Sequence, residues 1–562
     1  MLQLYGKPIF TIDGTDDDLQ FEQVIDFSGG EDDYRRSTLI AQNQCQKLVN
    51  VIVRDNYEAW TRPGADWFAS GPAGAGATVR TLVYFDTPQN KFLLAICNGI
   101  LSACAGQNQA WQSAFTASTT IGGVANACSS GATSYSASNT SAQVEIAQGV
   151  DTVLISDGVN ALAMMDGSLN LGTCGTGASD PPVGASILCW HTGRMFAAGF
   201  SGIGGSAVPR DTVAVSNLLA FGNGQWNLTT RSFRVGDGDG DPIIALYSMQ
   251  DSNLAVFKAN SVWLVNTPAT SDPSYSQTPV PNFSAVVNAE SVAFGVGCVG
   301  KRALCGVAKD IFFMAQDGVR SLQRMQAAAG QWQLSAPISQ PVQQYIEQIN
   351  PAAQSGIVAT SYKEFVFFAI PLGTSTVNNA VLVYNTRLSA WLGCWQNWTP
   401  SAWTVSRFNS VQQLLFGDSN GYVNYWKDAQ SVTEPSTYTD NGVNIATTIW
   451  TRSFQFLQAV NDKFPYNCTL RFTAGNAIVS VTAVMDLAQA LAWQASMQPE
   501  GDILGQHILG PFQLATVKPA KVEKSLRSCP AFNEMYLTIS TSSGYMQLRN
   551  ITVAAFLKAL DN

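Results

Sequence analysis

The chain has 562 residues, of which 46% are hydrophobic and 13% charged, and its net charge is −9 at pH 7. A chain of this length can bury more than one core. The charged share lies well below the quarter typical of soluble domains, so glycine and uncharged polar residues must fill many surface positions. The negative balance, without an extended cluster of Lys and Arg, argues against a protein that reads nucleic-acid sequence. The same negative charge is compatible with a protein whose neutral or acidic surface lets DNA pass without binding it.

The amino-terminal segment, residues 1–74, carries most of the local charge, in an acidic run at 16–18 and a mixed run at 31–36. It ends in an Arg-Pro-Gly turn at 62–64, and we expect it to pack on the domain or platform that follows. Its first residues lack a basic stretch followed by an apolar core, which predicts no signal peptide. No apolar run in the chain is long enough to span a bilayer. The sequence therefore predicts a protein made and folded in a cytoplasm.

The middle of the chain, residues 75–435, repeats a unit of two short apolar strands, a tight turn and a third apolar strand. Asn-Gly at 98–99, Asp-Gly at 157–158, Asn260 and Asp-Gly at 317–318 mark the turns. Their spacing fits a period of about 50 to 60 residues in which the gap between Asp157 and Asn260 spans two steps. These dipeptides supply the positive φ values that two-residue hairpins demand, which predicts β-meanders. One expected turn is missing, and the strands around His191 stand in its place.

With further units around Asn260, at 364–384 and at 413–423, this region predicts an all-β fold, a β-propeller of about six blades. Radial repetition is one of the few ways to hide the edges of so many strands. A pair of β-sandwiches is the alternative. Polar inserts at 116–141, 167–180 and 267–281 interrupt the units and are predicted to be long surface loops.

The last part, residues 436–562, changes character. Apolar and polar residues alternate at 445–456, 477–484, 535–540 and 551–557, which predicts strands with one buried face. We expect an additional, sandwich-like β domain beside the propeller.

One acidic loop is a candidate metal site. Asp237, Asp239 and Asp241 alternate with glycine, and three carboxylates on a flexible loop can converge on a hard cation such as calcium. The string begins like an EF-hand loop, but Pro242 stands where that loop needs Gly, and Ser248 stands where it needs a bidentate Glu. The alternative is an acidic turn that opens a strand. No other cofactor is predicted.

Neither cysteine nor histidine forms a recognisable chemical motif. The eleven cysteines are an odd number without a Cys-x-x-Cys pair, so we expect reduced core residues rather than a disulfide framework or a zinc site. The two histidines, His191 and His507, lie outside any catalytic motif, and each is expected to be structural. No catalytic residues are predicted.

Four tryptophans, Trp391, Trp395, Trp398 and Trp403, crowd one segment. They could stack on sugar rings, and this gives the alternative function of a sugar-binding or glycoside-cleaving β-propeller. Packing between blades is the other explanation, since large rings fill the wedge there. The chain also lacks the Ser-x-Asp-x-Gly-x-Thr-Trp box that sialidase propellers repeat, which argues against the enzyme.

Several short motifs follow one another in a characteristic order. A segment at 34–38 enters an Asn-Val strand at 48–51 and leads to the Arg-Pro-Gly turn at 62–64; further on come the stretch 294–319 and a strand-turn-Trp stretch at 384–391. In this order they resemble the tail nozzle proteins, also called tubular tail proteins, of short-tailed bacteriophages.

The resemblance implies a structural virion protein of the phage tail, assembled in the host cytoplasm and without catalytic residues. It implies a homo-oligomer, a hexameric ring that extends the portal and the adaptor protein. Such a ring is a conduit for DNA ejection through its lumen and a platform for tail fibres or tail-tip proteins. It implies no sequence recognition of the DNA and no membrane insertion.

Overall fold

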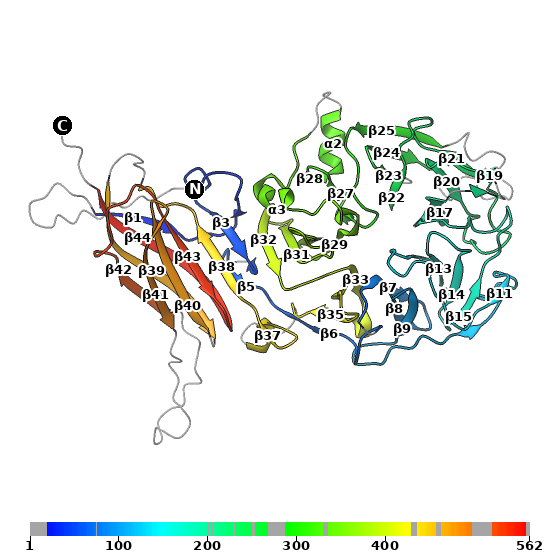
Figure 1. Cartoon of the computed structure of the whole chain (residues 1–562), viewed down its shortest axis with the longest axis horizontal. Helices are drawn as coiled ribbons and strands as arrows, with labels where there is room; N and C mark the ends of the chain where they lie inside the picture. Colours follow the sequence, from blue (N-terminus) through cyan, green and yellow to red (C-terminus); the bar gives the residue numbers. More distant parts are fainter. Residues whose placement is uncertain are drawn as a thin grey trace, which may run out of the picture.

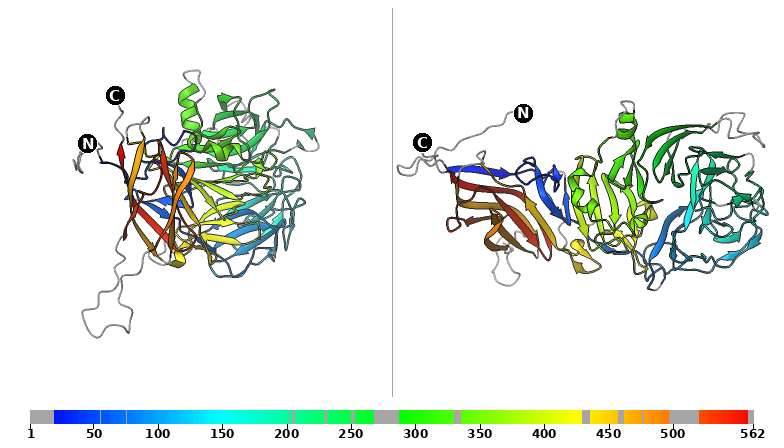
Figure 2. Two further views of the ribbon diagram at one scale, coloured as in Figure 1. Left: turned by 60° about the vertical axis from the view of Figure 1, so that its left-hand side comes forward. Right: turned by 45° about the horizontal axis from the view of Figure 1, so that its top comes forward.

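The computed structural model describes residues 19–54, 56–74, 76–200, 202–203, 206–228, 231–249, 253–267, 287–329, 335–428, 435–456, 462–475, 477–496 and 520–557. The protein is all-β, with 51% strand and 5% helix. Figure 1 shows a circle of small sheets and, beside it, a domain of long strands. The two parts lie next to each other along the long axis of the molecule (Figure 2).

Seven sheets follow one another along the chain and form what we call the ring, residues 65–426. The first four sheets contain β7 to β9 (Val79–Asp86, Lys91–Cys97, Ile100–Cys104), β10 to β15 (Thr116–Ala117, Ser130–Gly131, Glu145–Gly149, Thr152–Ser156, Ala163–Asp166, Asn170–Thr173), β16, β17, β20 and β21 (Ile187–His191, Arg194–Ala198, Thr212–Val215, Ser232–Arg234), and β22 to β25 (Ile243–Ser248, Asn253–Lys258, Ser261–Asn266, Asn288–Phe294). The last three contain β26 to β28 (Leu304–Val307, Asp310–Ala315, Gly318–Ser321), β29 to β32 (Val358–Tyr362, Phe365–Ile370, Ala380–Asn385, Ala390–Gln396), and β33 to β35 (Ala402–Ser406, Gln413–Gly417, Val423–Trp426) with β6 (Ala65–Trp67). The ring also contains a small hairpin of β18 (Gly202–Ile203) and β19 (Ser206–Ala207) and the short helices α2 (Leu322–Ala329), η2 (Gln340–Val342), α3 (Gln343–Glu347), η3 (Gln354–Gly356) and η4 (Phe408–Ser410).

Apolar runs and tight turns build these sheets. Strands β30 and β31 are buried along their whole length, as expected for strands covered on both faces. Asn98 and Gly99 have φ values of 52° and 77° between β8 and β9, and Thr192 and Gly193 have 47° and 74° between β16 and β17. Both turns therefore place two residues at positive φ, as two-residue hairpins require.

Every unit that the sequence marks in the middle region is a separate sheet, including the one around His191. The described residues contain seven such sheets, so the expected number of about six falls one short. The His-Thr-Gly turn replaces Asn-Gly without changing the backbone, because Thr192 itself adopts positive φ.

One edge strand of each sheet contacts the neighbouring sheets and is called its inner strand. Strand β7 contacts β12, β12 contacts β16, β16 contacts β22, β26 contacts β29, and β29 contacts β33. β22 and β26 contribute to one apolar cluster. Strand β33 contacts β7 in turn, which brings the last sheet beside the first. Strand β6, which precedes β7 in the chain, pairs with β35 of the last sheet, so segments from both ends of the ring share one sheet.

One further sheet and a continuation of the sixth sheet pack face to face and form what we call the two-sheet domain. One sheet contains β1 (Leu19–Val24), β4 (Val51–Val53), β5 (Ala59–Thr61), β39 (Lys463–Gly475), β42 (Ala520–Ser525) and β44 (Tyr545–Leu557). The other contains β2 (Gly30–Glu31), β3 (Gln44–Val49), β38 (Thr447–Thr451), β40 (Ile478–Met485), β41 (Ala488–Ser496) and β43 (Met535–Thr541). Leu470, Ile551, Val481 and Ile539, from both sheets, share one buried core.

The division into domains differs from the predicted one. Residues 1–74 were expected to form a separate segment, but β1 and β5 pair with β44, and β3 pairs with β38. The described residues 19–61 therefore belong to the two-sheet domain, and the ring begins with β6. Local sequence patterns predict strands but not partners hundreds of residues away, which explains the difference.

The polar inserts also differ from expectation. The insert at 116–141 contributes the short strands β10 and β11, which both pair with β15. The insert at 167–180 was predicted to be a loop, but it contains β15 itself. The insert at 267–281 lies outside the described residues apart from Thr267.

The ring and the two-sheet domain share a sheet. Strand β3 pairs with β32 of the sixth sheet at Val49 and Cys394, and the Asn50 amide donates to the Cys394 carbonyl at 3.0 Å. Gly393 has a φ of +76°, lies at an irregularity in the pairing of β31 with β32, and faces the Leu48 carbonyl so closely that a Cβ would collide with it. Glycine thus permits both the bulge and the close approach of the two domains.

Gly393→Ala tests this contact against Gly373→Ala, which shares a positive φ (+67°) but faces open space. We expect Gly373→Ala to cost about 1 kcal/mol through its backbone strain. Gly393→Ala should cost about 1 to 3 kcal/mol more, because the backbone of β3 must move. Urea unfolding followed by tryptophan fluorescence measures both, and equal losses would contradict a close-packed junction.

Candidate functional site

The three predicted metal ligands are engaged by different partners. Asp237 forms an ion pair with Arg234, and both oxygens of Asp239 lie 2.6 Å from Nζ of the buried Lys258. Asp241 accepts hydrogen bonds from the Asn260 amide and the Ser261 hydroxyl. Among the described residues no three His, Cys, Asp or Glu side chains lie close enough to hold a metal ion. Calcium binding stays a prediction, and it would require Asp239 to leave Lys258.

His191 bridges two sheets of the ring. Its ring is buried, with Nδ1 at 2.8 Å from the Ser248 hydroxyl and Nε2 at 2.8 Å from the Thr267 hydroxyl. Ser248 ends β22 in the fourth sheet, whereas His191 ends β16 in the third. These contacts support the structural role that was expected. His507 lies outside the described residues.

The tryptophan segment lies inside the protein. Trp391, Trp395 and Trp398 are at most 2% exposed, and Trp403 is half-buried against Phe416. The prediction that these rings pack between sheets is confirmed, and buried rings offer no platform for a sugar.

The junction between the domains contains a buried arginine. Arg62 has no exposed side-chain surface and forms a two-pronged ion pair with Asp440, at 3.1 and 2.6 Å. It also donates to Asn50 Oδ1 at 3.0 Å and to the carbonyls of Gln396 and Pro63 at 2.8 and 3.3 Å. Every partner comes from a different element or turn, so this one guanidinium ties β32, the β3–β4 connection and the strand pair β36 (Thr439–Asp440) and β37 (Val443–Asn444) together.

Aromatic rings enclose the same ion pair. The Arg62 guanidinium lies 4.7 Å from the ring centroid of Trp398 and 5.5 Å from that of Trp395, a cation–π geometry. Trp398 Nε1 donates to Asp440 Oδ1 at 2.9 Å, and the Ala65 amide donates to the same oxygen at 3.0 Å. The sequence marked Arg62 only through the Arg-Pro-Gly turn and did not reveal its partners.

A pair of basic residues, Lys301 and Arg302, contacts several sheets of the ring. Lys301 donates to the carbonyls of Gln143 and Ser186, at 2.6 and 3.2 Å, and Arg302 donates to the carbonyl of Arg80 at 2.8 Å. The pair precedes the fifth sheet, whereas its three acceptors lie at the entrances of the second, third and first sheets. The loop therefore reaches across the ring.

Glu145 completes this central cluster. Its carboxylate lies 3.5 Å from both Lys301 and Arg302, and the Arg302 carbonyl accepts from Ala359 of the sixth sheet. Burial lowers the pKa of Lys301. The sequence signal for this cluster is the adjacent pair of basic residues in a chain with so few charges, and it was not among the predicted sites.

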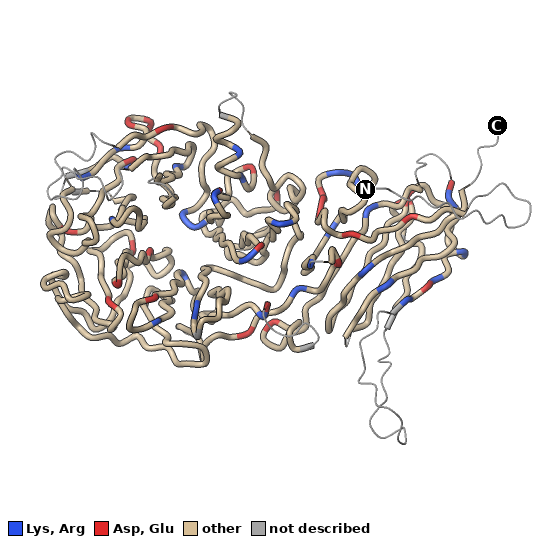
Figure 3. Tube along the Cα trace, turned by 180° about the vertical axis from the view of Figure 1, so that it is seen from behind, with Lys and Arg blue, Asp and Glu red and all other residues tan. Residues whose placement is uncertain are grey.

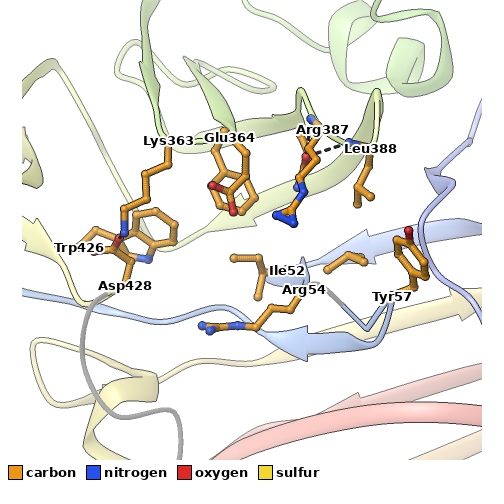
Figure 4. A pocket seen from close by; sticks show the side chains of 12 residues that line it. Ile52, Arg54, Tyr57, Lys363, Glu364, Arg387, Leu388, Trp426 and Asp428 are labelled. Atoms are coloured by element: carbon orange, nitrogen blue, oxygen red, sulfur yellow. Dashed lines mark hydrogen bonds and ion pairs between the residues drawn. The ribbon is translucent and has the colours of Figure 1, made fainter.

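A cleft of about 240 Å³ lies between the sixth sheet and β4 with the turn that follows it (Figure 4). Arg387 and Glu364 extend from the ring toward β4, while Lys363 turns to Asp428 at 2.5 Å. Arg54 lies on the other side, and its buried Nε has no hydrogen-bond partner among the described residues. The full lining is Ile52, Val53, Arg54, Tyr57, Lys363, Glu364, Phe365, Asn385, Arg387, Leu388, Trp426 and Asp428. These side chains suit recognition of a polar segment, and they include no Ser, Cys or His to act as a nucleophile with its base.

Two acids are buried where the amino-terminal segment meets the ring. Glu31 is 1% exposed and accepts from the Leu48 amide at 2.5 Å, while its second oxygen has no hydrogen-bond partner in the described structure. Burial raises the pKa of Glu31, and burial together with the neighbouring Asp32 raises that of Asp33 to about 7. The backbone amide of Asp33 donates to the Pro341 carbonyl, and its backbone carbonyl accepts from the Gln344 side chain. The Asp33 carboxyl is partly buried beside these bonds to the ring, so we expect the stability of the folded chain to depend on its protonation.

Charged positions are sparse along the described chain. Lys and Arg positions and Asp and Glu positions are interspersed along the traces of both domains (Figure 3). In the described part of the chain, no helix has the length and apolar character that crossing a membrane requires.

Comparison with known proteins identifies no family for this chain. No protein-family model matches the chain, and no curated protein matches it. Among solved structures, a computationally designed protein, Ika8, aligns with 64% of this chain and 99% of its own length, at 10% identity and a TM-score of 0.35.

Arg62→Met tests the junction. It leaves the Asp440 carboxylate buried without its counter-ion, which should cost about 3 to 5 kcal/mol of unfolding free energy. The double variant Arg62→Met/Asp440→Asn should recover part of this loss. Lys91→Met breaks a half-exposed ion pair with Asp86 and should change stability by less than about 1 kcal/mol. Calorimetry separates these cases, and a loss at Arg62 no larger than at Lys91 would contradict the proposed anchor.

Asp33→Asn tests the pH-sensitive contact. A carboxyl whose pKa is raised in the folded state binds more protons there, so its contribution to stability falls as pH rises from about 4 to about 7. The unfolding free energy of Asp33→Asn should fall by about 1 to 2 kcal/mol less over this pH range than that of the wild type. The remaining pH dependence is expected from Glu31. Unfolding at pH 5 and pH 8 measures the difference. The exposed Asp151→Asn is the control, and an unchanged slope in Asp33→Asn would refute the assignment.

Proposed function

We propose that residues 65–426 form a β-propeller of seven blades and that the chain is a non-enzymatic building block of a larger particle, the tail nozzle of a short-tailed phage. The circular series of inner-strand contacts and the pairing of β6 with β35 support the propeller, since propellers commonly hide their edges by such radial closure.

The observation that carries the structural role is the junction. The shared sheet and the buried Arg62 pair hold the ring and the two-sheet domain in one orientation. A rigid, elongated subunit suits an assembly whose geometry must be maintained. Because Lys301 and Arg302 reach from the loop before the fifth sheet to carbonyls of segments that lead into the first three sheets, we place the DNA in a lumen formed between copies, not inside the ring of one chain.

The surface supports association with other copies. Phe21 and Phe464 are 45% and 46% exposed, and they flank β44 on the face that points away from the core. Exposed apolar groups that lie together are typical of protein interfaces. With only 13% charged residues, the chain offers little like-charge repulsion between copies.

In this proposal six copies form a ring beneath the adaptor protein in the virion tail, and the outer surface carries tail fibres or tail-tip proteins. The scattered charge in Figure 3 fits DNA that passes without being held. The sugar-binding alternative has less support, because Trp391, Trp395 and Trp398 are buried.

Electron microscopy of phage particles that contain the chain, and sedimentation of the purified chain with its adaptor, test the proposal. We expect a ring of copies on the tail axis. Phe21→Ser/Phe464→Ser should weaken assembly about tenfold or more without lowering the Tm, because both rings are exposed. Val159→Ser, which removes an exposed side chain of the ring, is the control.

The nozzle assignment would be overturned if the chain stays monomeric with the adaptor, is missing from the tail and binds glycans on an array. Assembly that the double variant leaves unchanged would refute the Phe21 and Phe464 face alone.

A further inference from the structure

Two buried cysteines of the second sheet lie side by side. The Sγ atoms of Cys128 and Cys174 are 4.0 Å apart, and the two residues are 2% and 3% exposed. All eleven cysteines are free, and in the described structure this is the one pair with such an approach.

The two thiols join an insert to the sheet. Cys128 lies between β10 and β11, within the polar insert, and Cys174 directly follows β15. Both β10 and β11 have only two residues, and both pair with β15. Gly172 of β15 faces the Cys128 side chain so closely that a Cβ would collide with it. Around the thiols the amides of Ser118, Ser129 and Ala132 donate to carbonyls of β15, so the insert and the thiol pair meet at the same strand.

The local chemistry sets Cys128 apart. The two thiols share a hydrogen bond in which either sulfur can donate, and this bond lowers the pKa of Cys128, whereas burial raises the pKa of the core cysteines Cys97 and Cys468. The thiolate is the nucleophile in thiol–disulfide exchange. The shared hydrogen bond therefore favours the ionised form of one thiol of the pair, and the reaction is written with Cys128 as the attacking group and Cys174 as the resolving one.

We propose that Cys128 and Cys174 form a redox modification site that a small-molecule disulfide, such as oxidised glutathione, converts to an intrachain disulfide. The Cys128 thiolate attacks one sulfur of the reagent and expels a glutathione thiolate. Cys174 then loses its proton and attacks the Cys128 sulfur of the mixed disulfide, which expels the second glutathione. Two protein thiols and one reagent disulfide become one protein disulfide and two glutathione thiols.

The bond would tie the insert to β15. It closes a loop between positions that are 46 residues apart and so restricts the unfolded chain. In a particle that leaves a reducing cytoplasm for an oxidising medium, the insert would become covalently fixed. The crosslink itself does not depend on the nozzle assignment.

The test uses the full chain, purified with reductant and then incubated with oxidised glutathione under native conditions. Non-reducing proteolysis and mass spectrometry should find a peptide pair that joins Cys128 to Cys174 and lacks two hydrogens. Oxidation should raise the Tm and slow proteinase K cleavage at the exposed Val124 by about tenfold or more.

Cys128→Ser should abolish the crosslink and the protection, and Cys529→Ser, a half-buried cysteine of the two-sheet domain, should leave both intact. If Cys128→Ser fails to fold, Cys174→Ser and the wild-type peptide map still decide. A native chain whose two thiols remain free, a stable glutathione adduct on Cys128, or a crosslink that forms only in urea would overturn the proposal.

Discussion

A buried cation determines how this chain is put together. The Arg62 guanidinium has no contact with water, so each of its donors must find an acceptor inside the protein. Asp440, Asn50 and the Gln396 carbonyl meet that need, and they come from the carboxy-terminal part, the amino-terminal part and the sixth sheet. The requirement to satisfy one charge therefore joins segments that lie hundreds of residues apart.

The route of the chain follows from this anchor. Directly after Arg62 the chain enters β6, which completes the last sheet of the ring beside β35. Directly before it the chain forms β4 and β5 of the two-sheet domain. The Leu48 carbonyl approaches Gly393 at the same place, where a larger residue would not fit. Ring and two-sheet domain are consequently one body, and a role that needs a constant shape is better supported than one that needs the domains to move.

Several polar side chains inside the ring form hydrogen bonds and ion pairs that connect its sheets. Lys301 and Arg302 donate hydrogen bonds to carbonyls of segments that lead into three sheets, and both lie beside the Glu145 carboxylate. His191 bridges two neighbouring sheets. The acidic loop from Asp237 to Asp241 behaves in the same way, because each carboxylate neutralises or orients a nearby donor. Two sets of reactive or titratable groups remain. The acids Glu31 and Asp33, whose pKa values are raised, lie at the junction, and the thiol pair Cys128 and Cys174 lies beneath an insert.

The sequence by itself determined the all-β class, about six strand-turn-strand units and the strands β38, β40, β43 and β44 of the carboxy-terminal region, because alternation, apolar runs and Asn-Gly or Asp-Gly turns act over a few residues. It also indicated buried tryptophans and structural histidine. Only the tertiary structure decided that β1, β3 and β5 belong with β38 and β44, that residues 170–173 form a strand, and that Arg62 meets Asp440. Such contacts depend on which distant strands share an edge and which charges are buried together, and a local pattern holds no information about either.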